Sequence, residues 1–476
     1  MSAYTRQRSS FTHNMRISQA VSMSSLLTAT GLIAAAPQQP SNPLPPDQKI
    51  LGSGGNEDDH VGHFSTWSRN TKKEFLIDWQ RDKVSEWILV QGNEAGDLDS
   101  MVAALTWAYH LDHATQNTTD PLKAIALLQT NADALDLRPE NSLLLKHARM
   151  QHGHSDILTI DELPEDPETL SRKIRGIVLV DHPQPLRRWD DAKIISIFDH
   201  HKDRGAGPEA KPRIFEDVAS CTTIVARQML NELESLPEEY HMPHELLQMI
   251  LGAIALDSGG LQKENTSKAD VQTAERVLAR SRWHRRNLDD VMEDLDDKLS
   301  DAKKDIDHLG LRNLLRRDWK SDLIATPSSR TPFVNLGFAS IPFSIKEQIQ
   351  KTDFEALFDW FAIEAAWTAE VGVDISVILN KYKVKNKHGK KRKIREIILI
   401  VRSDARIDED QADDLFRTVS NAIESDKSLT NLKYWHNKEE LGPRRQIWTH
   451  EREDAGRKVI KPLVEAAVDA AVKGWN

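Results

Sequence analysis

Asp199, His200 and His201 stand side by side in the segment FDHHKD, directly after the apolar stretch IISIF. Carboxylate oxygens and imidazole nitrogens are ligands of divalent metal ions. Successive residues of a strand point to opposite faces, so the pattern predicts Asp199 and His201 on one face and His200 on the other. Three metal-capable residues after a predicted strand indicate a metal site.

Three more acidic segments follow apolar runs that we interpret as strands. GNEAGDLDS follows WILVQ, VDHP follows GIVLV, and ALDSGG follows MILGAIA. The carboxyl edge of a parallel sheet is where open α/β sheets bind their ligands. The sequence therefore predicts one metal centre at this edge. The carboxylates expected there are Asp97, Asp99, Asp181 and Asp257, and the same segments also contain Asn93 and His182.

Strand-like and helical segments alternate from residue 67 to about residue 280, which predicts an α/β domain with a parallel sheet over 67–300. A strongly charged helical stretch leads into a smaller second α/β domain, 301–476. In this second domain NKHGKKR is typical of a hairpin tip. Residues 1–66 are predicted to be a flexible or targeting leader.

The composition is that of an ordinary globular protein, 39% hydrophobic and 29% charged over 476 residues. A net charge of −10 argues against general nucleic-acid binding. The single cysteine, Cys221, forbids an intrachain disulfide and fits a reducing compartment, so we expect a cytoplasmic protein. No apolar run reaches the roughly 18 to 20 residues that span a bilayer.

The leader leaves three interpretations open. It contains Arg6, Arg8 and Arg16 and no acidic residue before Asp47. This composition is consistent with a disordered extension, with a mitochondrial transit peptide, or with a secretory signal if Met15 were the start. In each case we expect catalysis to survive removal of residues 1–60.

The four acidic segments, in this order, resemble the four motifs of the DHH phosphoesterase family. The first resembles GNE-x-x-D-x-DS of the eukaryotic exopolyphosphatase branch, with Asn93 where the family pyrophosphatases have His. Pro183 stands where the family often has Asn. The second domain resembles the DHHA2 domain that follows in this family. The resemblance implies an active site in the cleft between the two domains.

The resemblance also implies two divalent metal ions, Mn or Mg, with Co or Zn as alternatives. Asp97 and Asp181 would hold the first ion, with Asn93 at its edge. Asp181 would bridge to the second ion. The ligands of the second ion would be Asp99, Asp181, His200 and Asp257.

Other residues would handle the substrate. His201 would reach the phosphate as a donor, with Asp199 orienting an imidazole, whereas His182 is left between direct catalysis and support of the ligands. GRKVIKPL resembles the SRK-type motif of the family, in which an Arg–Lys pair holds phosphates. The expected substrate-binding residues are Arg457 and Lys458, with Arg445 and Lys346 as secondary candidates.

The implied function is hydrolysis of terminal phosphate from inorganic polyphosphate by a hydroxide activated by the two metals. The alternatives are a prune-like phosphatase, an inorganic pyrophosphatase or a nucleotide phosphodiesterase, or a scaffold on a DHH fold. The basic tract Lys381–Arg395 is either an electrostatic guide for a polyanion, a solvated hairpin tip or a nuclear-import signal. For Ser220 and Thr222 we favour simple capping of the following helix over phosphate binding.

Overall fold

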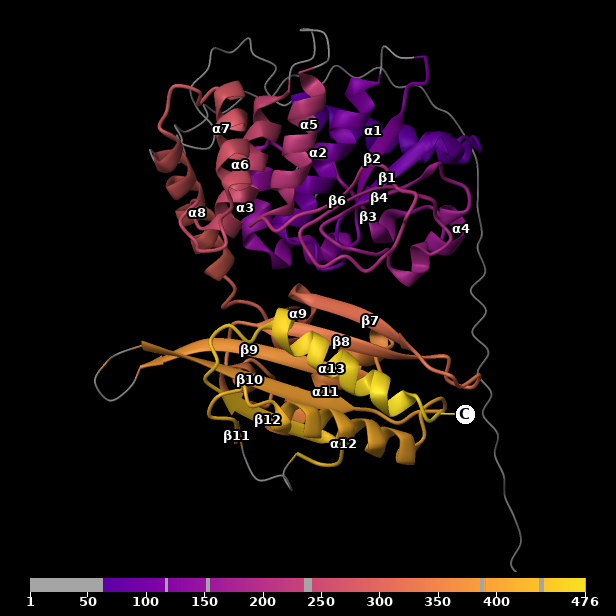
Figure 1. Ribbon diagram of the computed structural model, residues 1–476, viewed down its shortest axis with the longest axis vertical. Coiled ribbons are helices and arrows are strands. Elements are labelled where there is room, and N and C mark those ends of the chain that lie inside the picture. Colours follow the sequence, from indigo (N-terminus) through magenta and orange to yellow (C-terminus); the bar gives the residue numbers. More distant parts are fainter. Residues whose placement is uncertain are drawn as a thin grey trace, which may run out of the picture. The chain divides into compact units, whose positions relative to one another are not determined.

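The computed structural model describes residues 63–115, 119–150, 155–234, 242–385, 389, 391–435 and 441–475. All of them lie in one compact unit of the chain. This unit holds two six-stranded sheets, one in each half of the chain (Figure 1). The described chain begins with helix α1 at His63, and helix α8 runs through residue 300.

The first sheet is parallel throughout and has the strand order β3-β2-β1-β4-β5-β6. The order reverses direction between β1 and β4. Such a switch point opens a crevice at the carboxyl ends of the strands, where α/β sheets bind ligands. The strands are β1 (Trp87–Gln91), β2 (Lys123–Leu128), β3 (Leu158–Thr159), β4 (Gly176–Val180), β5 (Ile194–Asp199) and β6 (Arg213–Phe215).

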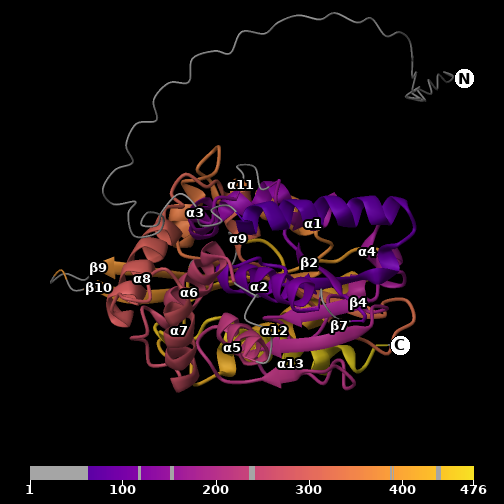
Figure 2. The same ribbon diagram turned by 90° about the horizontal axis from the view of Figure 1, so that it is seen from above.

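Helices cover both faces of this sheet, as the alternating pattern predicts (Figure 2). Buried side chains of α2, α5, α6, α7 and α8 pack on one face, and Phe75 of α1 and Leu170 of α4 pack on the other. The helices are α1 (His63–Gln80), α2 (Leu98–Ala114), α3 (Pro139–His147), α4 (Pro167–Ser171), α5 (Cys221–Leu233), α6 (His244–Ser258), α7 (Lys268–Arg280) and α8 (Leu288–Lys304).

One predicted strand is wrong. The run MILGAIA, which precedes Asp257, lies inside helix α6. Almost every residue of α6 is buried, so its sequence is apolar all round and carries no helical period. A short apolar run of this kind cannot be distinguished from a buried strand by periodicity. Asp257 therefore stands in the last turn of a helix, which Gly259 ends with φ +59°.

The second sheet is mixed, with the order β11-β12-β10-β9-β8-β7. β8 and β9 are parallel, and the other described neighbours are antiparallel. The predicted hairpin is confirmed as β9–β10, and Lys390 at its tip lies outside the described residues. The strands are β7 (Trp319–Ala325), β8 (Phe333–Ile341), β9 (Ile375–Lys385), β10 (Lys391–Val401), β11 (Lys433–Tyr434) and β12 (Arg445–His450).

Helices also cover both faces of the second sheet. α12 and α13 lie side by side over the face formed by Ile375, Val377 and Leu379 (Figure 1). The opposite face, with Ile378, packs against α9 and α11. The helices are α9 (Leu311–Arg317), α10 (Ile345–Ile349), α11 (Leu357–Glu370), α12 (Glu409–Ser425) and α13 (Arg457–Val472).

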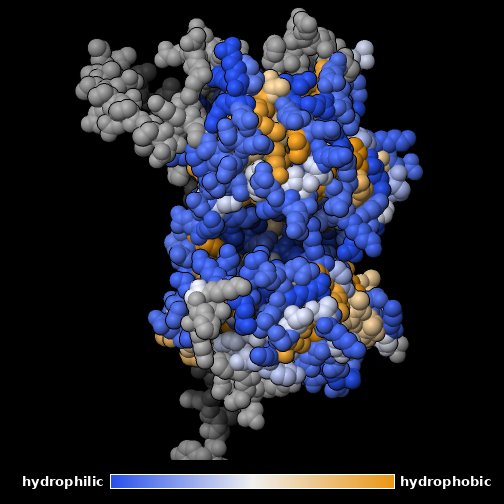
Figure 3. All heavy atoms as spheres, turned by 60° about the vertical axis from the view of Figure 1, so that its left-hand side comes forward, coloured by the Kyte–Doolittle hydropathy of each residue, from blue (hydrophilic) through white to orange (hydrophobic). Residues whose placement is uncertain are grey.

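The described surface is mainly polar. The face shown in Figure 3 is mostly hydrophilic, with apolar side chains in separate patches. None of the described helices combines the length and the apolar character that crossing a bilayer requires.

Candidate functional site

The loop from β1 to α2 brings the first motif to the switch point of the sheet. Position 92 leaves no room for a side chain, because a Cβ on Gly92 would stand 2.6 Å from Ser100 Oγ. Gly96 adopts φ +55°, a conformation that favours glycine. Asp97 is the N-cap of α2, and its carboxylate accepts from the Ser100 N–H at 3.1 Å. Asp97 thus both caps helix α2 and lies at the candidate site.

Asn93 presents its amide nitrogen to the acidic side chains. Its Oδ1 accepts from the backbone N–H groups of Ala95 at 2.9 Å and Gly96 at 3.1 Å. Its Nδ2 donates to Asp181 Oδ2 at 2.7 Å and to Asp97 Oδ2 at 3.3 Å. An amide nitrogen has no lone pair for a metal, so Asn93 in this orientation acts as a hydrogen-bond donor.

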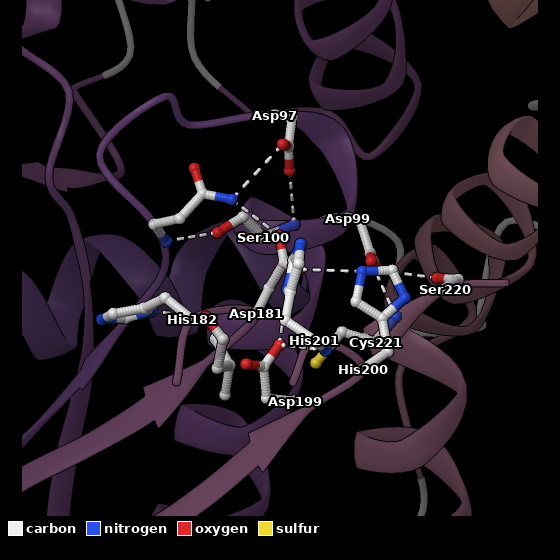
Figure 4. Close-up of polar contacts among 12 residues, drawn as sticks. Asp97, Asp99, Ser100, Asp181, His182, Asp199, His200, His201, Ser220 and Cys221 are labelled. Carbon is white, nitrogen blue, oxygen red and sulfur yellow. Dashed lines mark hydrogen bonds and ion pairs between the residues drawn. The ribbon is translucent and has the colours of Figure 1, made fainter. Parts of the chain in front are cut away.

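Asp181 lies at the centre of the site, directly after β4 (Figure 4). It is 3% exposed and has φ +60°, a left-handed conformation that is strained for a residue other than Gly. Its buried Oδ1 is paired with the imidazole of His200, whose Nε2 lies 3.2 Å away. Burial and the nearby negative charge of Asp97 raise the pKa of Asp181.

Two imidazoles face this oxygen. His200 Nε2 lies 3.2 Å and His201 Nδ1 3.6 Å from Asp181 Oδ1, and ligand atoms of the three residues lie within 4.8 Å of one another. The prediction that His200 points away from His201 is therefore wrong. β5 ends at Asp199, so the two-residue alternation of a strand stops before the two histidines.

Backbone and carboxylate contacts orient the two rings. His200 Nδ1 lies 3.1 Å from the carbonyl oxygen of Val218, which leaves Nε2 toward Asp181. His201 Nδ1 lies 2.8 Å from Asp199 Oδ1, so Asp199 supports an imidazole as expected. Holding one ring nitrogen by a backbone or carboxylate oxygen is how proteins fix a metal-binding tautomer.

Asp99 belongs to the first turn of α2, and its buried carboxylate contacts the N-terminus of helix α5. Its Oδ2 accepts from the Cys221 N–H at 2.7 Å, and its Oδ1 accepts from the Thr222 N–H at 2.8 Å. The hydroxyls of Ser220 and Thr222 also donate to Oδ1, each at 2.6 Å. Our interpretation that Ser220 or Thr222 caps α5 with its own side chain is thus wrong, because Asp99 takes that role. The acidic charge lies favourably at the positive end of the helix.

Asp257 reaches the same electrostatic environment from the end of α6. Burial and the negative charges of Asp99, Asp97 and Asp181 raise its pKa well above the usual value. The pKa values of Asp181 and Asp257 are thus both raised by burial and by neighbouring negative charge. Mutual repulsion of this kind is typical of a metal centre.

His182 is separate from the metal-capable group. Its Nδ1 lies 2.9 Å from the carbonyl oxygen of Val180, and in Figure 4 its ring points away from Asp181 and His200. Burial lowers the pKa of His182 to about 4, so the imidazole is neutral at pH 7. Its buried Nε2 has no hydrogen-bond partner in the described part of the chain.

Positive charges stand beside the acidic group. Burial opposes ionisation of Asp97, but the charges of Lys320 and Arg138 outweigh it and lower the pKa of Asp97 to about 2. Arg138 is 5% exposed and donates from Nε to the carbonyl oxygen of Ala95 at 2.8 Å. Asp97 thus lies between the acidic centre and a cationic region.

Asp318 gathers the cations on that side. Its Oδ1 lies 2.9 Å from Arg457 Nη2 and 3.5 Å from Arg138 Nη2. Arg457 also donates to Ser340 Oγ at 2.9 Å. Burial opposes ionisation of Asp318, but Arg457, Arg138 and Lys320 lower its pKa far below the usual range. Asp318 and Ser340 thus hold the guanidinium of Arg457 in place.

Sequence reasoning missed Arg138, Asp318 and Lys320. The segment RDWK runs from the last residue of α9, Arg317, into the start of β7, where Lys320 is the second residue, so a basic residue at the start of a strand was the available signal. Arg138 immediately precedes Pro139 at the start of α3, and its neighbours in sequence give no functional signal. Its link to Asp318 joins distant parts of the chain.

The other predicted phosphate-binding residues are not all gathered here. Lys458 is exposed in the first turn of α13, next to Arg457. Arg445 instead stacks over Phe361 of α11, with its guanidinium carbon 4.3 Å from the ring centroid. Lys346 is exposed in α10, and no described contact links it to the acidic centre. Arg445 and Lys346 stay predictions.

Family models match both halves of the chain. The model of the DHH family, N-terminal domain, matches residues 87–254, and the model of the DHHA2 domain matches residues 297–467. The first match covers the parallel sheet up to helix α6, and the second covers the mixed sheet. The two matches agree with the expected order of domains.

Individual proteins are also similar. "Putative exopolyphosphatase" of Schizosaccharomyces pombe is 32% identical over 48% of this chain and 59% of its own length. "Probable manganese-dependent inorganic pyrophosphatase" of Lactobacillus delbrueckii is 23% identical over 40% of this chain and 53% of its own length. The chain thus matches little more than half of each relative.

A solved structure shares the fold. The crystal structure described as a "Methanococcus jannaschii putative family II inorganic pyrophosphatase" matches 80% of this chain and 99% of its own, with a TM-score of 0.51 and 16% identity. The family-model matches, the α/β folds of the two halves and the order of the motifs agree. The chain belongs to the DHH family and carries a DHHA2 domain after its N-terminal DHH domain.

Proposed function

We propose that this protein is an exopolyphosphatase that releases orthophosphate from the end of inorganic polyphosphate with the help of two divalent metal ions. The observation that supports the proposal is that a group of acidic and imidazole side chains lies next to a group of cationic side chains. The acidic and imidazole group around Asp181 suits metal ions, and Arg138, Lys320 and Arg457 suit phosphate. The likeness to the relative from Schizosaccharomyces pombe supports the same substrate.

The donor set fits divalent cations. Asp181 Oδ1 is buried, and ring nitrogens of His200 and His201 lie 3.2 Å and 3.6 Å from it, so the three side chains could share one ion. Asp97 and Asp181 would hold one ion, with Asp181 shared by the second. Carboxylates with an imidazole suit Mn or Mg, and the manganese-dependent relative supports Mn. The second ion would be held by Asp181, His200, Asp257 and the remaining free lone pair of Asp99.

The bound ions would supply positive charge and lower the pKa of a water molecule. Arg457, fixed by Asp318 and Ser340, would hold the terminal phosphate groups in line for attack. Lys320 and Lys458 would stabilise the charge that grows on the transferred phosphoryl group. His201, oriented by Asp199, would donate a proton or hydrogen bond to a phosphate oxygen.

Inorganic pyrophosphatase activity is the second candidate, and the likeness to the Lactobacillus relative favours it. Asn93 argues for the longer substrate. The first ion would lose a ligand at Asn93, because its oxygen is bonded to the backbone of its own loop. A substrate with more phosphates brings more contacts to cations outside the metal site, such as Arg457, and depends less on that ion.

A phosphate-release assay separates these functions. The full chain is compared on pyrophosphate, tripolyphosphate, long polyphosphate, ATP and a cyclic nucleotide, with Mn²⁺, Mg²⁺, Co²⁺, Zn²⁺ or a chelator. We expect release of orthophosphate from polyphosphate with Mn²⁺ or Mg²⁺ and none with the chelator. A strong preference for pyrophosphate would replace the proposal by the second candidate, and no release from any substrate would indicate a scaffold.

A further inference from the structure

The β9–β10 hairpin extends beyond the sheet as a two-stranded arm. β8 pairs with β9 as far as Asn380, and β12 pairs with β10 as far as Arg395. Farther out, the described pairs join only β9 and β10, and they end with Lys385 opposite Lys391. Figure 1 shows the two strands continuing past their neighbours. The arm is therefore a two-stranded ribbon, and neither of its outer edges pairs with another described strand.

One face of the arm carries a row of positive charges. Lys385 pairs with Lys391, Lys383 with Lys393, and Lys381 with Arg395. Residues directly opposite in an antiparallel pair point to the same face, and every second residue continues that face. We call this set the cation ladder; its members are Lys381, Lys383, Lys385, Lys391, Lys393 and Arg395.

The cation ladder continues an apolar face. Ile375, Val377 and Leu379 are buried under α12 and α13, and the same alternation in β9 then reaches Lys381, Lys383 and Lys385. The change from apolar to cationic residues coincides with the end of the sheet that surrounds β9. The face is thus the one on which α13 begins.

The ladder is costly for the fold by itself. Like charges directly opposite each other destabilise a strand pair. Burial and the charges of Arg395, Lys393 and Lys383 lower the pKa of Lys381, so these cations act on one another. Glu453 offers partial compensation, with its carboxylate 2.6 Å from Lys393 Nζ and its backbone carbonyl accepting from Arg395. An anion with several charges would relieve the rest of this repulsion.

The inner end of the ladder adjoins the candidate site. A Cβ on Gly456 would stand 3.5 Å from Arg395 Nη1, and Gly456 is the N-cap of α13. The next residue, Arg457, is bonded to Asp318. Arg395, at the inner end of the ladder, therefore lies beside the N-terminus of α13, whose first residue is the arginine proposed to hold the reacting end of the substrate.

We propose that the cation ladder is a binding site for the distal part of a long inorganic polyphosphate chain whose end lies at Arg457. The inference rests on the proposed function for its substrate class. Polyphosphate carries closely spaced charges and no bases, and the ladder offers no stacking platform. The aromatic residue in the described part of the arm, Tyr382, lies on the opposite face and donates to Glu396 at 2.9 Å. Single-stranded nucleic-acid sites combine cations with aromatic stacking.

The kinetic test removes three exposed charges of the ladder, with Lys383→Gln, Lys385→Gln and Lys391→Gln in one variant. The matched control removes three exposed lysines elsewhere, with Lys73→Gln, Lys427→Gln and Lys473→Gln. We expect the ladder variant to raise KM for long polyphosphate about tenfold and to leave kcat and tripolyphosphate hydrolysis unchanged. Its KM should also depend less on salt. Equal changes in both variants, or equal effects on both substrates, would overturn the proposal.

A second comparison tests the face itself. Lys391 and Arg392 are exposed neighbours on β10 whose side chains point to opposite faces. Lys391→Gln should weaken binding of long polyphosphate more than Arg392→Gln. Equal weakening would indicate diffuse attraction to the arm and would contradict a site on one face.

Direct binding separates this proposal from the proposed function. Binding of long polyphosphate is measured by isothermal titration calorimetry in the presence of a chelator, when no turnover is expected. Wild type should bind more tightly than the ladder variant, even if the protein hydrolyses none of the substrates. Equal affinity of both would reject the ladder. Single-stranded RNA of equal charge that competes as well as polyphosphate would replace the proposal by general polyanion binding.

Discussion

Asn93 Nδ2 donates a hydrogen bond to Asp181 Oδ2 over 2.7 Å, between the loop after β1 and the end of β4. The two residues meet at the switch point of the parallel sheet, where the strand order reverses. Asn93 is buried, and its oxygen is already bonded to the loop backbone. Asn93 therefore holds Asp181 in place as a hydrogen-bond donor. A residue that bound a metal ion at this position would have to offer a lone pair.

Replacing the donor by a ligand should therefore change substrate preference. Asn93→His puts an imidazole lone pair near Asp97 and Asp181, so we expect tighter metal binding and higher activity on pyrophosphate relative to polyphosphate. The ratio of kcat/KM for the two substrates, measured over a manganese titration, checks this. Asn93→Ala serves as the control that removes the donor without adding a ligand. An unchanged ratio in Asn93→His would exclude Asn93 as a determinant.

Removing the cations proposed to bind the reacting phosphates should slow the reaction on every substrate. Arg457→Ala, Lys458→Ala and Lys320→Ala each remove a charge that the proposed function assigns to phosphoryl transfer, so we expect kcat to fall about a hundredfold on tripolyphosphate and on long polyphosphate. Lys73→Ala is the comparison for an exposed lysine outside the candidate site. Because Arg457 also holds Asp318, Arg457→Lys tests whether charge alone restores turnover. A loss restricted to long chains would contradict this role.

His450 should make the protein less stable in mild acid. It is 1% exposed, and burial with the charges of Arg395 and Arg452 lowers its pKa to about 4. In the unfolded chain the pKa of a histidine is about 6.5. As pH falls from 6.5 to 4 the unfolded state takes up a proton that the folded state does not, so stability falls by up to about 3 kcal/mol.

Urea unfolding of wild type and His450→Gln at pH 7 and pH 4.5 measures this contribution. Glutamine does not titrate, so the variant should lose less stability between the two pH values than wild type. Equal losses would show that His450 is not a source of the acid sensitivity.

Much of this architecture could be predicted from the sequence because its signals are local. The apolar runs before Asn93, Asp181 and Asp199 gave strands β1, β4 and β5, and the charged stretch near residue 290 gave helix α8. The prediction failed at α6, where burial of almost every residue removes the helical period. It also failed at His200, because the alternation of a strand does not extend past its last residue.

Tertiary contacts account for what the sequence did not show. The bonds of Asp99 to the N-terminus of α5 and of Arg138 to Asp318 join residues far apart in the chain. The orientation of the Asn93 amide depends on backbone N–H groups of its own loop. No residue type or spacing encodes these contacts directly, since they follow from how the elements pack.

The most direct measurement of the central claim compares phosphate release from long polyphosphate by wild type, Asp181→Asn and Asn93→Ala at saturating Mn²⁺. Asp181 would be the shared ligand of the proposed two-metal arrangement, so Asp181→Asn should abolish release, while Asn93→Ala should retain measurable activity. Melting curves of all three would show that folding is preserved. Equal activity of wild type and Asp181→Asn at saturating metal would contradict the two-metal centre.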